Sequence, residues 1–133
     1  MKNDEAIKTD IFKYIKGTPL HQAITGVLSK RKRPKSSDKE DILISVLANT
    51  CGQVQEAVVN VNIYVKDIQV KNQAEEDTIR LDELCRLALQ IFKRNRAYVA
   101  DGCFYLTLIS QSVIEKGEEH VINNRIRYEH LNE

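Results

Sequence analysis

The 133-residue sequence has few cysteines, little net charge and no long hydrophobic segment, and each absence excludes a class of protein. Three widely separated cysteines provide neither a disulfide framework nor the paired spacing of a zinc-binding motif. Twenty Lys+Arg oppose nineteen Asp+Glu, so the net charge of +1 creates no overall attraction to nucleic acid or an anionic membrane. The longest apolar runs have four residues, as in Ala97–Ala100, whereas a membrane-spanning helix needs about 20. We therefore expect that this chain is not a disulfide-rich, zinc-finger or membrane-spanning protein.

Recognisable catalytic motifs are also missing. The five glycines occur singly, so no glycine-rich loop is available to cradle a phosphate. His21, His120 and His130 are not spaced as metal-ligand pairs. Cys85 lies on the apolar stripe of a predicted helix, which is typical of a small core residue rather than a nucleophile. The sequence predicts a protein without enzymatic activity, cofactor or metal.

The length and composition predict one globular domain over residues 1–133. Hydrophobic residues make up 42% and charged residues 29%, which are values of folded rather than disordered chains. The first ten residues are polar and acidic, where a secretory signal peptide would be basic and then apolar. We therefore expect a cytosolic protein.

Two helices are predicted from a 3.6-residue apolar period and from capping residues. The first covers Ile7–Ile15, and Thr18 and Pro19 then start a short helical turn as N-cap and first helical residue. The spacing of Asn72 and Glu75 predicts a capping box at the start of the second helix. This helix is expected to pack against the strand predicted at residues 59–66. Its apolar positions are Leu81, Leu84, Cys85, Ala88, Ile91 and Phe92.

Alternating apolar and polar residues predict the strands. Residues 42–49 and 59–66 form an expected hairpin, and residues 104–109 and 122–129 form two later strands. Residues 27–35 read as an edge strand or the arm leading from one, because a proline cannot donate to a strand ladder. The predicted class is α+β, with an antiparallel sheet of about four to five strands and two helices on one face, in the order α-β-β-β-α-β-β.

Five of the twenty basic residues gather in one short stretch, followed by a polar loop that ends at residue 41. We call residues 30–35 the basic segment; its cations are Lys30, Arg31, Lys32, Arg33 and Lys35. It could be a localisation signal or nucleic-acid arm, or a charged edge that discourages strand pairing. It could also face an acidic patch across a subunit boundary, such as residues 38–41 or 75–77. No aromatic residue interrupts it, so base stacking there is not expected.

Several short segments of the sequence, taken in order, resemble one protein family. They are Thr18-Pro19-Leu20, Ile24-Thr25-Gly26, Lys32-Arg33-Pro34, Ser36-Ser37, Glu40-Asp41-Ile42, the strand Val58–Val65 and the terminal strand His120–Tyr128. Together with the order of elements they are similar to the tail-completion or tail-terminator (head–tail joining) proteins of long-tailed phages and prophages. The resemblance implies a non-enzymatic subunit of a ring, typically a hexamer, that caps the tail tube or joins it to the head connector.

The resemblance implies several partners and a location. The partners would be other copies of the chain, tail-tube and head-connector proteins, and DNA that passes through a channel. The protein would occupy the host cytoplasm during assembly and then the virion tail or neck. Of the site residues, only the basic segment and the loop to residue 41 are carried over, as interface or lumen residues. Apolar positions expected on the outer sheet face also suggest a partner surface: Leu43, Leu47, Val58, Tyr64 and Val113.

Two other functions remain open from the sequence. A nucleic-acid-binding module acting through the basic segment would bind with an affinity that falls steeply with salt concentration. A small enzyme or ligand-binding domain would need a deep pocket with converging polar groups, which no motif announces.

Overall fold

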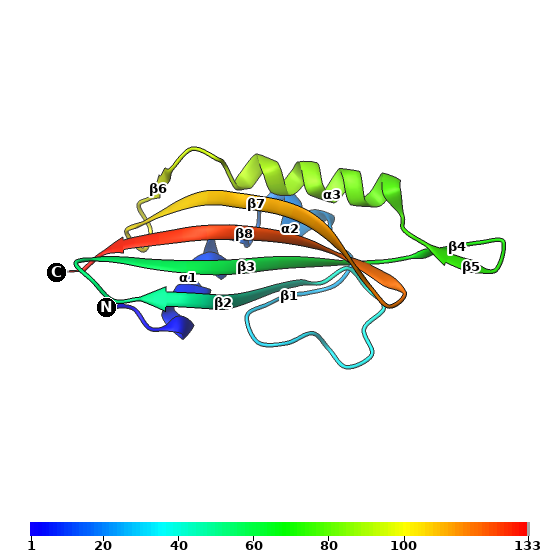
Figure 1. Cartoon of the computed structure of the whole chain (residues 1–133), viewed down its shortest axis with the longest axis horizontal. Coiled ribbons are helices and arrows are strands. Elements are labelled where there is room, and N and C mark those ends of the chain that lie inside the picture. The colour runs from blue at the N-terminus through cyan, green and yellow to red at the C-terminus, as the bar shows by residue number, and fades with distance from the viewer. Residues whose placement is uncertain (133) are drawn as a thin grey trace.

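Eight strands and three helices make up residues 1–132, the part of the chain described by the computed structural model (Figure 1). None of the helices in this part is both long and apolar enough to traverse a bilayer. The helices are α1 (Asp4–Ile15), α2 (Pro19–Ala23) and α3 (Thr78–Ile91). The strands are β1 (Leu28–Ser29), β2 (Ile42–Thr50), β3 (Val54–Lys66), β4 (Ile68–Val70), β5 (Gln73–Glu75), β6 (Ala97–Val99), β7 (Phe104–Lys116) and β8 (Glu119–Leu131).

The predicted fold class is wrong. The molecule is mostly β, with a mixed six-stranded sheet in the order β1-β2-β3-β8-β7-β6, a separate two-stranded sheet β4-β5, and three helices rather than two. β1 pairs in parallel with β2, because the loop of residues 30–41 carries the chain back before β2 begins. β1, β4, β5 and β6 have two or three residues each, too few for a visible alternation.

The predicted start of the second helix is also wrong. Residues 73–75 form β5, and Lys71 and Asn72 are the turn between β4 and β5, both with positive φ (50° and 63°). Asparagine favours such turns as well as helix caps, which explains the error. The observed cap is Asp77, whose side chain accepts from the Arg80 N–H. The predicted cap at Thr18, with Pro19 in the first turn of α2, is confirmed.

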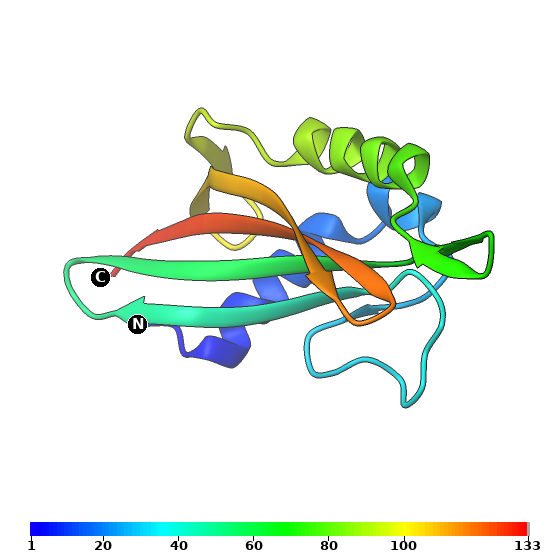
Figure 2. The ribbon, with the colours of Figure 1, turned by 45° about the vertical axis from the view of Figure 1, so that its right-hand side comes forward.

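The large sheet is curved into a half-barrel, and the helices fill its concave side (Figures 1 and 2). Register shifts in β2 at Leu47 and in β7 at Ile109 add one residue to each strand, which increases twist and bending. One cluster of buried side chains joins the three helices to the concave face of the sheet. Its largest members are Tyr128, Phe92, Phe104, Ile7, Ile11, Ile15, Leu20, Ile42, Ile44, Ile63, Leu84 and Ile122.

Candidate interaction site

Arg33 of the basic segment points into the protein. Its Nε donates to Asp41 Oδ2 (3.0 Å) and its Nη1 donates to Glu119 Oε1 (2.9 Å) at the start of β8. The guanidinium also lies over the buried ring of Tyr64, 4.1 Å from the centroid. Arg33 therefore ties the loop of residues 30–41 to β3 and β8.

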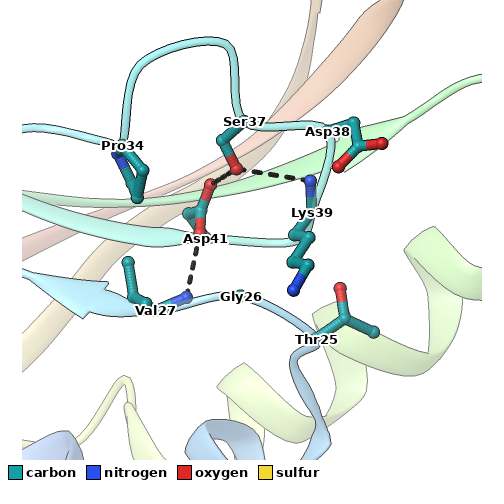
Figure 3. A pocket seen from close by; sticks show the side chains of 8 residues that line it. All are labelled: Thr25, Gly26, Val27, Pro34, Ser37, Asp38, Lys39 and Asp41. Carbon is teal, nitrogen blue, oxygen red and sulfur yellow. Dashed lines mark hydrogen bonds between the residues drawn. The ribbon is translucent and has the colours of Figure 1, made fainter.

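Asp41 is the buried acceptor that organises this loop. Its side chain accepts from the Val27 N–H (2.9 Å) and the Ser37 hydroxyl (2.6 Å) (Figure 3). It also accepts from Arg33. A Cβ at Gly26 would lie 2.1 Å from Asp41 Oδ1, so only glycine leaves room for the carboxylate. Burial by itself raises the pKa of Asp41, but the hydrogen bonds from Ser37, Val27 and Arg33 outweigh it and lower that pKa.

A pH-dependent stability follows from this lowered pKa. The stabilising contribution of ionised Asp41 is present above its ordinary pKa of 3.8 and is lost as the pH falls through the lower folded-state pKa. We expect the free energy of unfolding, measured in urea at pH 7 and about pH 3, to fall with acid, and to fall less in Asp41→Asn. The exposed Asp38→Asn is the matched control. Equal acid sensitivity of Asp41→Asn and the wild type would assign the effect to other carboxylates.

Glu40, the residue before Asp41, fixes the same loop to α3. It accepts from Arg80 Nε (2.6 Å) and Arg80 Nη2 (2.7 Å), and Arg80 Nη2 also donates to the Ala23 carbonyl (2.5 Å). The Glu40 N–H donates to Thr25 Oγ1 (3.0 Å). The hydrogen bond to Glu40 is the largest effect that raises the pKa of Arg80. Residues 24–26 and 40–41, which carry part of the family resemblance, thus hold the loop in place.

A hollow of about 280 Å³ opens beside this network (Figure 3). The carboxylate of Asp41 forms part of its wall, but its donors are already the Val27 amide, Ser37 and Arg33. Every buried side-chain N or O atom among residues 1–132 has a hydrogen-bond partner. Among the described residues, the wall of the hollow therefore contains no buried side-chain N or O atom without a hydrogen-bond partner. Its lining residues are Thr25, Gly26, Val27, Pro34, Ser37, Asp38, Lys39 and Asp41.

The other cations of the basic segment are placed differently from Arg33. Lys30 Nζ donates to Thr9 Oγ1 on α1 (2.8 Å). Arg31, Lys32 and Lys35 are exposed, and none of them forms an ion pair with a residue that the structure describes. The basic segment therefore divides into two cations held by the protein, Arg33 and Lys30, and three cations available to a partner.

The residues considered for catalysis are scattered. His120 Nδ1 lies 2.7 Å from Asp67 Oδ1, His21 Nδ1 accepts from the Gly17 N–H, and His130 lies at the C-terminal end of β8. All three cysteines are free, and burial raises the pKa of the Cys85 thiol, which disfavours the reactive thiolate. Within residues 1–132 no cluster of His, Cys, Asp or Glu is suited to hold a metal ion.

β2 and β7 are each longer than the short outermost strand beside them, so part of the backbone edge of each is left open. β6 pairs only with Phe104–Leu106 of β7, and β1 pairs only with Ile42 and Leu43 of β2, among the described residues. We call residues 109–116 the β7 edge and residues 45–50 the β2 edge. α3 approaches the β7 edge through Gln111, whose Nε2 donates to a backbone carbonyl of α3 (3.2 Å), while residues 112–116 are exposed.

These edges carry exposed apolar side chains and few charges. Val113 and Ile114 on β7 are 43% and 51% exposed, and Leu47 on β2 is 59% exposed. Neither residues 109–114 nor residues 45–50 contain a charged residue or a proline, which natural edge strands commonly use to prevent pairing. Of the apolar positions expected to need a partner, Leu47 and Val113 are exposed, Leu43 and Val58 are half-buried, and Tyr64 is covered by Arg33.

Comparison with known proteins assigns no family to this chain. No protein-family model matches it, and no curated protein matches it either. Its function must be inferred from the loop of residues 30–41 and the two open edges.

Proposed function

We propose that this chain is a non-enzymatic structural subunit of a phage or prophage particle, of the tail-terminator or head–tail joining type, and that it acts as a homo-oligomer. The observation that carries the proposal is the long open β7 edge with its exposed Val113 and Ile114. An open strand edge with few charges in a folded domain is a surface for another chain, because its unpaired N–H and C=O groups can be completed by a second strand. The proposed location is the host cytoplasm during assembly and afterwards the tail or neck of the virion.

The loop of residues 30–41 supports the same proposal. Arg33 and Glu40 fix both ends of the loop to the body of the protein, so its exposed part is presented by a rigid support. Arg31, Lys32 and Lys35 remain outside this network. A fixed loop with exposed cations is suited to contact an acidic neighbour in a particle, where charge complementarity selects the partner.

Purified heads and tails from phage that lack this protein test the proposed function. Addition of the chain should restore head–tail joining, counted by electron microscopy, and sedimentation velocity should detect oligomers as the concentration rises. The tail tube and the head connector are the expected partners. A chain that stays monomeric from micromolar to millimolar concentration, and that binds to neither heads nor tails, would overturn the proposal.

The exposed cations provide a more specific prediction. We expect Arg31→Glu, Lys32→Glu and Lys35→Glu, combined in one variant, to weaken oligomers or joining without loss of thermal stability, because these side chains have no partner within the described chain. Joining activity and melting temperature should be measured together. The matched control is Lys13→Glu, Lys16→Glu and Lys93→Glu, a variant with the same charge change at exposed positions outside residues 30–41. Equal joining by both variants would exclude the loop as the contact.

A nucleic-acid-binding module is the second candidate, favoured by the same three exposed cations, which form no ion pair with residues 1–132. It predicts that fluorescence anisotropy detects DNA binding whose affinity falls linearly with salt on a logarithmic scale, with a slope of about −0.9 per phosphate contact. The triple glutamate variant should then lose DNA binding while it still oligomerises. That pattern would place nucleic-acid binding ahead of a protein contact for this loop.

A further inference from the structure

We infer that copies of this chain associate head to tail through their sheets, with the β7 edge of one copy pairing antiparallel with the β2 edge of the next. The inference rests on the proposed assembly role and names the partner of the open edge as a second copy of the same chain. No other protein would be needed to complete either edge.

The directions of the strands favour this pairing. From β2 to β3, from β3 to β8 and from β8 to β7, each neighbouring pair is antiparallel. Three such steps leave β2 and β7 running in opposite directions. If a second copy is placed beside the first in the same orientation, its β2 edge meets the β7 edge as an antiparallel neighbour, the commoner way in which strands pair.

The outward-facing backbone groups of the two edges also favour this pairing. The Leu108 N–H donates away from β8 to the Lys93 carbonyl, and the Ile42 N–H donates away from β3 to the Val27 carbonyl. Outward groups alternate along an antiparallel ladder, and each bulge shifts the alternation by one residue. By this count the backbone of Val113 faces outward from β7 and that of Val46 faces outward from β2. The outward N–H and C=O groups of each edge can therefore form hydrogen bonds with those of the other edge.

Side-chain orientation agrees with such a joint sheet. Val46 is opposite Val59, and Val113 is opposite Ile122, so both outward-facing residues carry their side chains on the concave, helix-covered face. Residues paired across two strands must share a face, and these two do. The absence of charge from residues 45–50 and 109–114 means that no like-charged pair opposes contact.

A two-fold dimer is the competing arrangement. Two β7 edges could pair with each other, but the β2 edge of both copies would then stay open. Head-to-tail pairing completes both edges with one type of contact, and its repetition produces a closed ring or an open filament, depending on the rotation between copies. The two arrangements differ in whether the β2 edge takes part.

Lysine substitutions at the two edges test the inference. Val113→Lys and Leu47→Lys should each weaken self-association of the full chain at least tenfold, because a lysine on an edge strand opposes pairing. An equimolar mixture of the two variants should form a dimer and no larger species, since one intact β7 edge and one intact β2 edge remain. Sedimentation velocity separates these species. Ile79→Lys, at a 79% exposed position on α3, is the matched control and should associate like the wild type.

Amide hydrogen exchange of the wild-type chain gives a second readout that does not depend on how the variants fold. The Val113 and Val46 amides should both become protected as the concentration rises. Protection of Val113 alone, with association lost in Val113→Lys but retained in Leu47→Lys, would overturn the inference in favour of a two-fold dimer. Protection of neither amide in an oligomer would place the contact elsewhere and also overturn it.

These experiments distinguish a failure of the inferred strand pairing from a failure of the proposed function. If the chain joins heads to tails but both lysine variants associate normally, the strand pairing is wrong and the assembly role stands. If the edges pair as inferred but the chain binds neither heads nor tails, the particle role is wrong and the chain is a self-assembling protein of another kind.

Discussion

Replacing Arg33 by alanine is expected to lower the free energy of unfolding by about 3–5 kcal/mol, the usual cost of removing one partner from a buried ion pair. The side chain is 17% exposed and holds the carboxylates of Asp41 and Glu119 together. Without it, Asp41 keeps its negative charge in a buried place with only Ser37 and the Val27 amide as donors. Urea denaturation followed by circular dichroism would measure the change.

Lys32→Ala is the matched control for this experiment. It removes a neighbouring cation that is exposed and makes no ion pair with the described residues, so its effect should stay within about 0.5 kcal/mol. A loss of less than about 1 kcal/mol in Arg33→Ala would show that the loop does not depend on the Arg33 network.

The Arg33 result also decides how the loop can be tested as an interface. A glutamate at this position would put a third carboxylate beside Asp41 and Glu119. The resulting loss of stability would resemble a loss of partner binding. Interface variants should therefore change Arg31, Lys32 and Lys35 and leave Arg33 in place.

Leu84→Ala is expected to lower the free energy of unfolding by about 2–5 kcal/mol, because it removes buried methyl groups and leaves a cavity. Leu84 on α3 is fully buried in the same cluster as Val59, Val61 and Ile63 of β3. Water can fill the cavity left by the substitution only if α3 moves away from the sheet. Thermal and urea denaturation should both detect the loss.

Leu89→Ala is the control on the same helix, at a position that is 44% exposed. It removes the same atoms from a place where solvent can fill the space, so a clearly smaller loss is expected. Equal losses in the two variants would mean that the effect comes from helix formation rather than from core packing.

The local sequence determined those elements whose signals lie within a few residues. Ile7, Ile11 and Ile15 form the buried stripe of α1, and Thr18 with Pro19 starts α2 as predicted. Leu84, Ala88 and Phe92 are buried as predicted from the helical period, and Ile91 is half-buried. Helical and strand periods can be read from sequence because each depends only on which side chains must leave water.

Only the tertiary structure determined how the short strands pair in the sheet and which cations of the basic segment are bound within the protein. The parallel pairing of β1 and the short β6 depend on neighbours far along the chain, and strands of two or three residues show no period of their own. Arg33 is distinguished from Lys32 and Lys35 by its ion pairs with Asp41 and Glu119 and by its contact with Tyr64. Glu119 and Tyr64 are distant from Arg33 in sequence and close to it in the fold. A run of cations looks uniform in sequence because charge is a property of each residue, whereas a partner is a property of the folded chain.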